Sequence, residues 1–257
     1  MPAKKKRLDI CVVERGLAES RERARALIMA GKILVNDQRV EKPGSRVNDD
    51  DTIRVKGKDI PYVSRGGLKI EAALEAFKID VHDRTCLDVG ASTGGFTDCL
   101  LQKGARHVFA VDVGYGQLAW QLRQDARVTV IERTNIRNIQ YSVINRKVDL
   151  ITIDVSFISL DIVIPAVVPF MHADTLIVAL IKPQFEVGKG QVGKKGVVKD
   201  PVLHRQVIER LRSGLGSIGL EIQQVIPSPV LGPKGNREFL SEIIISPSGS
   251  GYAESST

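Results

Sequence analysis

Four charged residues have the types and positions needed to remove a proton from a hydroxyl group. Three stand at the ends of apolar runs and one lies earlier in the chain, and they are Asp154, Lys182, Glu238 and Lys69. A sugar hydroxyl is a poor nucleophile, but an amine can take its proton where desolvation and a second cation lower the pKa of that amine. Each residue alone would be explained as a solvated strand end. The four together favour base catalysis.

A glycine-rich turn within Cys86–Asp98 offers the place where these residues could converge. The stretch changes there from an apolar run to a helical pattern. In open α/β sheets a ligand lies outside the carboxyl ends of the strands, where glycines let it contact the backbone. Ser92 occupies the third position of the dinucleotide motif G-x-G-x-x-G, so the pyrophosphate-binding form is absent. The alternative is an ordinary strand, turn and helix with glycines for packing, because isolated glycine motifs are weak.

An acidic residue about twenty positions further on indicates the ligand. The apolar run His107–Val111 ends in Asp112, whose carboxylate could accept hydrogen bonds from both hydroxyls of an adenosine ribose. S-adenosylmethionine fits this pattern because it carries no phosphate, and its positive amino and sulfonium groups suit an acidic neighbour such as Asp88. The sequence therefore predicts a methyl-donor site at this turn.

Composition indicates a globular protein. The 257 residues, 43% of them hydrophobic, suffice for one large domain with a smaller one attached. No apolar run approaches the roughly 20 residues of a membrane span, and the start of the chain lacks a signal peptide, so we expect a cytoplasmic protein. The three cysteines and four histidines are scattered, which predicts reduced thiols and no metal site.

The positive charge is concentrated at the beginning of the chain. Residues 1–62 hold 15 lysines and arginines against 10 aspartates and glutamates, whereas the rest holds 22 against 20. Such an excess is typical of a phosphate-binding module, although a charge run can also be a solvated face. We predict a domain over 1–60, a linker over 57–63, a second domain over 61–246 and a disordered tail over 247–257.

The first domain shows a pattern of two helices followed by short strands. A helix is expected over 8–16, a second helix capped by Ser20 and ended by Gly31, a hairpin over 32–40 and a strand over 52–55. This pattern resembles the αL RNA-binding module of a ribosomal small-subunit protein and of several RNA-modifying enzymes. The resemblance implies contacts to RNA phosphates from four basic residues, which are Arg7, Arg21, Arg25 and Lys32.

The second domain alternates strands and helices, which predicts an α/β fold with a mainly parallel, doubly wound sheet. The last two strands, over 220–228 and 238–246, leave no room for a crossover helix and should pair antiparallel. A helix is expected from Ser64, with Leu68, Ala72 and Leu74 facing inward. The loop over 183–200 is expected to be a basic lid on an anionic substrate, with lysines that include Lys189, Lys194 and Lys195.

The charged residues carry a closer resemblance. Residues 64–246 are similar to the FtsJ-type ribose 2′-O-methyltransferases, which use a Lys-Asp-Lys-Glu tetrad, and the whole chain resembles the TlyA family, also labelled haemolysin A. The matching residues are Lys69 in Ser64-Arg-x-x-x-Lys, Asp154 in Ile-Asp-Val-Ser-Phe, Lys182 in Ile-Lys-Pro-Gln-Phe and Glu238 in Asn-Arg-Glu-Phe. The resemblance implies that Lys182 is the base, that Lys69 and Glu238 orient the hydroxyl, and that Asp154 tunes Lys182 beside the donor.

The resemblance also implies a Rossmann-like S-adenosylmethionine-dependent domain and its contacts. Asn135 stands where many relatives place an acid against the adenine amino group, and its amide oxygen could accept the same bond. The donor-binding residues predicted from the turn and the resemblance are Asp88, Gly90, Ala91, Ser92, Thr93, Gly94, Gly95, Phe96, Asp112, Val113, Asn135 and Asp154. The implied reaction is methylation of cytidine riboses in small- or large-subunit ribosomal RNA, with susceptibility to capreomycin and viomycin. We expect a monomer.

Three other functions are open from the sequence. Asp154-Val-Ser-Phe157 also resembles the D-P-P-Y tetrapeptide of enzymes that methylate base amino groups, a chemistry that needs no lysine base. The haemolysin label suggests a cytolysin, but the sequence shows no long amphipathic helix of the kind that lies in membranes. A non-catalytic ribosome-assembly factor is the third alternative.

Overall fold

The chain folds into two compact units, Met1–Pro61 and Tyr62–Thr257. The computed structural model describes residues 5–56, 60–188, 190–193 and 196–247. The predicted tail over 247–257 lies outside the described residues except for Pro247, and so do Lys189, Lys194, Lys195 and residues 57–59 of the predicted linker. No helix among the described residues is both long enough and apolar enough to cross a membrane.

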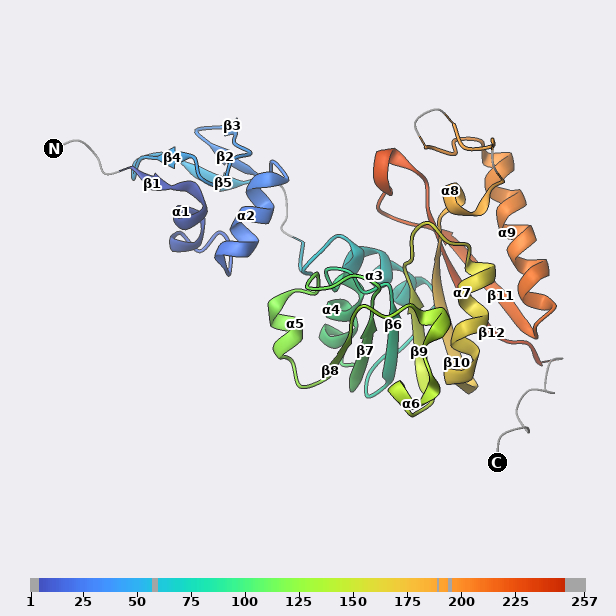
Figure 1. The fold of residues 1–257 in the computed structure, drawn as a ribbon. Coiled ribbons are helices and arrows are strands. Elements are labelled where there is room, and N and C mark those ends of the chain that lie inside the picture. Colours follow the sequence, from blue (N-terminus) through green and yellow to red (C-terminus); the bar gives the residue numbers. More distant parts are fainter. Residues whose placement is uncertain (1–4, 57–59, 189, 194–195, 248–257) are drawn as a thin grey trace. The chain divides into compact units, whose positions relative to one another are not determined.

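The N-terminal unit packs two helices against short antiparallel strands (Figure 1). Its elements are β1 (Lys6–Arg7), α1 (Leu8–Glu14), α2 (Arg21–Met29), β2 (Ile33–Val35), β3 (Gln38–Arg39), β4 (Arg46–Val47) and β5 (Ile53–Val55). Ser20 caps α2 by accepting a hydrogen bond from Arg23 N, as expected. Asn36 and Asp37 both have positive φ between β2 and β3, the conformation of a type I′ turn that matches the twist of a hairpin.

Asp9 ties the two helices of this unit together. Its side chain is fully buried and accepts hydrogen bonds from Arg7 Nε at 2.9 Å and from Arg21 Nε at 3.0 Å. These bonds, that of Arg7 first, hold the pKa of Asp9 down at about 2, against 3.8 for a free side chain, so Asp9 is ionised at neutral pH. Arg7 and Arg21 therefore stabilise the fold of this unit, whatever else they contact.

The C-terminal unit is built on a seven-stranded sheet in the order β11-β12-β10-β9-β6-β7-β8 (Figure 1). Its strands are β6 (Thr85–Val89), β7 (His107–Val111), β8 (Val128–Ile131), β9 (Val148–Ile153), β10 (Met171–Ile181), β11 (Leu220–Pro227) and β12 (Phe239–Ile245). The five strands β10, β9, β6, β7 and β8, which are neighbours in this order, pair in parallel. Strand β12 lies between β10 and β11 and is antiparallel to both. This arrangement confirms the predicted mainly parallel α/β sheet with an antiparallel last strand.

Helices cover both faces of this sheet (Figure 1). The unit contains α3 (Gly66–Ala76), α4 (Gly95–Gln102), α5 (Trp120–Gln124), α6 (Tyr141–Ile144), α7 (Leu160–Val167), α8 (Pro183–Glu186) and α9 (Pro201–Gly216), with the short 3-10 helices η1 (Ile136–Asn138), η2 (Val168–Phe170) and η3 (Pro233–Gly235). Helices α3 and α4 contact each other on one face, whereas α7 and α9 pack together on the other. The main core lies under α7 and α9, where residues such as Ile151, Ile177 and Leu211 are fully buried.

Two helices differ from the prediction for identifiable reasons. The sequence pattern predicts a helix over 115–125, but the segment over 115–119 is a loop because Gly116 has a φ of +71°, so α5 starts at Trp120. In α3 the buried stripe is Ile70, Ala73 and Leu74, whereas Leu68 and Ala72 are half-buried. The stripe continues to Phe77 with helical spacing, so this face of α3 packs on the core in place of the face that carries Leu68 and Ala72. The same orientation turns Lys69 toward the interior.

Candidate active site

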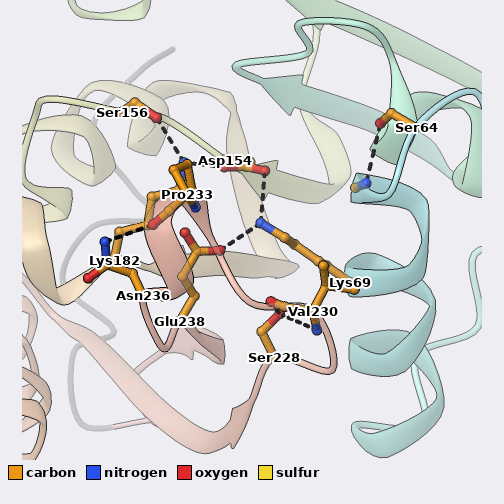
Figure 2. A network of polar contacts seen from close by, with 11 residues as sticks. Ser64, Lys69, Asp154, Ser156, Lys182, Ser228, Val230, Pro233, Asn236 and Glu238 are labelled. Atoms are coloured by element: carbon orange, nitrogen blue, oxygen red, sulfur yellow. Dashed lines mark hydrogen bonds and ion pairs between the residues drawn. The ribbon is translucent and has the colours of Figure 1, made fainter. Parts of the chain in front are cut away.

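The four charged residues singled out from the sequence meet in one place. Lys69 Nζ donates a hydrogen bond to Glu238 Oε2 at 2.7 Å and lies 3.9 Å from Asp154 Oδ2. Lys182 Nζ lies 2.5 Å from Asp154 Oδ1. Figure 2 shows the result, in which Asp154 stands between the two amines and Lys69 stands between the two carboxylates. Charges thus alternate along the chain of contacts, as buried ions require.

The sheet topology explains why three of these residues converge. Asp154 follows β9 and Lys182 follows β10, and these strands are parallel neighbours. Strand β12 runs the opposite way, with Phe239 paired to Ile181, so Glu238 at its beginning reaches the same edge. The carboxyl ends of two strands and the amino end of a third therefore supply the site.

Close backbone packing brings the fourth residue, Lys69, to this edge. Helix α3 crosses the start of α4 with almost no space between them, since a Cβ added at Gly95 would lie 2.2 Å from Ser64 Oγ and 2.9 Å from Gly67 N. Lys69 lies one turn into α3, and only 9% of its surface is exposed. A solvated lysine, the ordinary expectation near a helix start, is therefore not what the fold provides.

The tetrad lines a cavity of about 340 Å³, which we call the acceptor cavity. Its wall also includes residues from the glycine turn, from the start of α3 and from the segment before Glu238, namely Ser64, Arg65, Gly66, Gly90, Ala91, Ser92, Thr93, Gly95, Phe96, Ser156, Val230, Leu231, Gly232 and Pro233. Glu238 Oε1 is buried and has no hydrogen-bond partner among the described residues. A buried acceptor of this kind suits a donor group on a ligand.

A second cavity of about 540 Å³, the donor cavity, adjoins the first. Its walls come mainly from the ends of β6, β7 and β9, and are Val89, Gly90, Ser92, Val111, Asp112, Val113, Gln117, Thr134, Asn135, Ile136, Arg137, Asp154, Val155, Ser156, Phe157, Ile158 and Val163. The two cavities share Gly90, Ser92, Asp154 and Ser156. One ligand could thus reach from the donor cavity to the tetrad.

Gly90 is required by both its conformation and its surroundings. Its φ is +85°, and an added Cβ would lie 2.4 Å from the backbone oxygen of Asp154. Gly94 also has positive φ but contributes to neither cavity wall, and its missing side chain makes room for Leu118 and Leu122. The turn is therefore shaped by close approach as well as by ligand access.

Asp112 holds the glycine turn to the next strand end. Its Oδ2 accepts a hydrogen bond from Ser92 N at 2.8 Å, and its Oδ1 accepts one from Gly114 N at 2.6 Å. Each carboxylate oxygen can accept a further bond. Asp112 is half-buried and lines the donor cavity, as does the exposed Val113.

The position of Asp88 differs from the one that a contact with the methyl donor would require. Its side chain is fully buried, accepts hydrogen bonds from Thr97 and Thr152, and forms no part of either cavity wall. Burial raises the pKa of Asp88 to about 6, only partly offset by these bonds. Asp88 supports the glycine turn by joining β6 to α4 and β9. Because it lines neither cavity, this geometry gives no support to the predicted contact with the positive groups of the methyl donor.

Asn135 lines the donor cavity, but its amide oxygen is already in use. That oxygen caps η1 by accepting hydrogen bonds from Arg137 N at 3.1 Å and Arg137 Nε at 3.3 Å. The amide nitrogen is then the group with free donors. The expected acceptor role toward an adenine amino group therefore does not fit this side-chain orientation.

Two residues absent from the predicted site lie at the boundary of the cavities. Ser156 lines both, and its Oγ accepts a hydrogen bond from Lys182 Nζ at 3.0 Å. Phe157 lines the donor cavity with 89% of its surface exposed and packs against Phe185 with ring centroids 4.8 Å apart. They stand two and three residues after Asp154 in the sequence, and this proximity was the signal available.

The structure describes four of the seven basic residues that were expected to contact RNA. Arg25 and Lys32 are exposed in the N-terminal unit, whereas Arg7 and Arg21 are engaged with Asp9. Within the described part of the chain, no group of three or more His, Cys, Asp or Glu side chains could hold a metal ion.

A glycine substitution tests the close approach at the turn. We expect Gly90→Ala to lower the free energy of unfolding by about 3 kcal/mol or more, because a left-handed conformation costs about 1–2 kcal/mol and the clash with Asp154 adds to it. Gly16→Ala is the matched control, with φ of +67° and nothing within 4 Å of the added Cβ. Urea unfolding followed by circular dichroism measures both; equal losses would contradict a role for the contact.

Comparison with known proteins agrees with this architecture. The FtsJ-like methyltransferase model matches residues 62–242, and the S4 domain model matches residues 6–53. The 16S/23S rRNA (cytidine-2′-O)-methyltransferase TlyA of Mycobacterium tuberculosis is 49% identical over 238 residues, which cover 92% of this chain and 89% of that protein. Hemolysin A of Brachyspira hyodysenteriae is 42% identical over 93% of this chain and all of its own length.

A solved structure shows the same fold. A protein of Streptococcus thermophilus described as a hemolysin superposes with a TM-score of 0.74 at 41% identity, covering 95% of this chain and 89% of its own. The matches extend over both units of the chain and include the elements that carry the tetrad. The chain therefore belongs to the TlyA family, with an S4 domain followed by an FtsJ-like methyltransferase domain.

Proposed function

We propose that the protein transfers a methyl group from S-adenosylmethionine to the 2′-hydroxyl of a cytidine in ribosomal RNA of the small subunit, the large subunit or both. The observation that carries the proposal is the tetrad, in which two lysine amines and two carboxylates in mutual contact line one cavity. The 49% identity to a relative named for this reaction supports the substrate. Susceptibility to capreomycin and viomycin is proposed on the same basis.

The donor cavity has the features that S-adenosylmethionine needs. Asp112 has acceptor capacity left for the ribose hydroxyls, and Ile136 and Val155 offer apolar walls to the adenine. Asn135 would donate from its amide nitrogen to a ring nitrogen. Asp154 lies in both cavity walls, where its carboxylate suits a positive methionine group. The bound donor supplies an electrophilic methyl group.

Lys182 is the proposed base. A neutral amine has two N–H donors and one lone pair, and the contacts of Lys182 Nζ with Asp154 and Ser156 can occupy both donors. The lone pair is then left to face the acceptor cavity. It takes the proton of the 2′-hydroxyl as the oxygen attacks the methyl carbon and the bond from that carbon to sulfur breaks.

Lys69 and Glu238 would position the hydroxyl. Glu238 Oε2 fixes the Lys69 ammonium at 2.7 Å, which leaves further N–H donors for the ribose oxygen. Glu238 Oε1 is buried and would accept a hydrogen bond from a second substrate group. Gly232 permits this placement, because a Cβ there would lie 2.0 Å from that oxygen.

The N-terminal unit is proposed to hold folded RNA through its phosphates. Arg25 and Lys32 offer exposed charges, and the outer N–H groups of Arg7 and Arg21 can still donate. Lys189, Lys194 and Lys195 are proposed to contact RNA as well. We propose a monomer in the cytoplasm that binds no metal.

Replacing the base separates this mechanism from its main alternative. We expect Lys182→Ala to lower the rate of methyl transfer by about 10²–10⁴-fold, because a general base contributes that much. S-adenosylmethionine affinity, measured by calorimetry, should change less than twofold. Lys147→Ala is the control, since Lys147 is exposed and donates to Pro169 O. A base-amino methyltransferase would keep most of its activity in the Lys182 variant, and that result would contradict the proposal.

Two arginines of α2 distinguish RNA contact from folding. We expect Arg25→Ala to weaken binding to ribosomal RNA and to flatten the plot of log affinity against log salt by about one unit, with unchanged stability. Arg21→Ala should also raise hydrogen exchange in α1 and α2, because it removes a bond to buried Asp9. An Arg25 variant with the wild-type salt slope would argue against phosphate contact there.

A further inference from the structure

Glu186 is a buried carboxylate outside the tetrad that the proposed reaction does not use. It ends α8, the single turn that follows Lys182 directly. Its side chain is only 2% exposed. Oε1 accepts a hydrogen bond from Leu160 N at 2.8 Å, and Oε2 accepts one from Ser159 Oγ at 2.7 Å. Arg210 Nη2 lies 2.5 Å from Oε2.

These partners join the two loops that carry catalytic residues. Ser159 and Leu160 form the start of α7, which follows the loop that begins at Asp154. Glu186 lies four residues after Lys182, in the segment that follows β10. A single carboxylate therefore links the segment after β9 to the segment after β10.

The link stands just beyond the point where β9 and β10 stop pairing with each other. The last paired residues of β9 and β10 are Ile153 and Ala179, so both Asp154 and Lys182 lie beyond the ladder. Their contact of 2.5 Å depends on the relative position of two loops. Asp154 N donates to Val89 O of β6 at 2.9 Å, and Ile181 pairs with Phe239 of β12. Glu186 therefore adds a direct connection between two segments that the sheet joins only through other strands.

Arg210 anchors this link to a long helix. It lies in α9, contacts Asp161 of α7 and also donates to the backbone oxygen of Glu186 at 3.3 Å. Gly214, one turn later, allows the helices to approach, because an added Cβ would lie 2.9 Å from Asp161 Oδ1. The 16-residue helix α9 thus provides a rigid support for both loops.

We propose that Glu186, held by Ser159 and Arg210, is a positioning residue that sets the distance between Lys182 and Asp154. It does not touch the substrate or the donor. The inference rests on the proposed function, in which Lys182 acts as the base. It predicts that a change at Glu186 slows the chemical step while leaving both binding steps intact, since a shift of 1 Å can cost about 10²-fold in rate.

The test compares Glu186→Gln with the wild-type full-length protein. The amide keeps the side-chain volume but replaces one carboxylate oxygen with an NH2 group. In either orientation this NH2 group faces a hydrogen-bond donor, which is Leu160 N on one side and the Ser159 hydroxyl with the Arg210 guanidinium on the other. We expect kcat to fall at least tenfold, with the KM for ribosomal RNA and the Kd for S-adenosylmethionine within twofold of wild type. Arg210→Met should lower kcat in the same way, and Arg210→Lys should restore part of it.

Asp149→Asn is the matched control for lost stability. Asp149 lies at the opposite end of β9, where it accepts a hydrogen bond from Thr85 N at 2.7 Å and contacts His172. Like Glu186, it is a carboxylate that joins a backbone N–H group to a second side chain, but its side chain is 34% exposed and lies away from the tetrad. We expect a comparable fall in melting temperature with kcat within twofold of wild type, measured well below both melting temperatures.

The outcomes separate the inference from the proposed function. An unchanged kcat in Glu186→Gln would overturn the positioning role, and so would a fall in kcat of the same size in Asp149→Asn. Neither result affects the proposed function, which the activity of the wild-type protein tests. If Glu186→Gln does not fold, unchanged kcat in folded Arg210→Met would overturn the role equally. A wild-type protein that transfers no methyl group would overturn the proposed function and the inference with it.

Discussion

The alternation of charge among Glu238, Lys69, Asp154 and Lys182 is the interaction on which the site depends. Two lysine amines and two carboxylates line one cavity, and an unpaired ion there would be strongly destabilised. Asp154 contacts both amines and so fixes the spacing of the set. Loss of Lys69 would leave Glu238 without its ion-pair partner in the set, and loss of Asp154 would leave Lys182 without its own. The same pairing that allows burial also brings the amines and the carboxylates to the wall of the cavity.

The rest of the C-terminal unit serves to hold these four residues in register. Parallel pairing aligns the ends of β9 and β10, and the antiparallel β12 returns Glu238 to the same edge. Glycines at the helix starts allow α3 to lie against α4 closely enough for Lys69 to arrive. Asp88 and Asp112 fasten the glycine turn from two sides. The site is thus a product of sheet topology and close backbone packing together.

Sequence patterns predicted the fold class and the convergence of the tetrad, because strand ends in an α/β sheet meet at one edge. They failed where side-chain orientation decides the role. Asp88 has the right spacing for a ligand contact, but its place on the strand faces α4, where Thr97 binds it. The amide oxygen of Asn135 is taken by a helix cap. Ser156 was missed because a single serine carries no pattern, and its importance comes only from its contact with Lys182.

The central claim is that the tetrad directs a methyl group to a ribose oxygen. Its most direct test is mass spectrometry of nucleosides from ribosomal RNA that the purified protein has treated with isotope-labelled S-adenosylmethionine. The account predicts label in 2′-O-methylcytidine and in no other nucleoside. Label on a cytosine amino group, or no label in RNA at all, would contradict it.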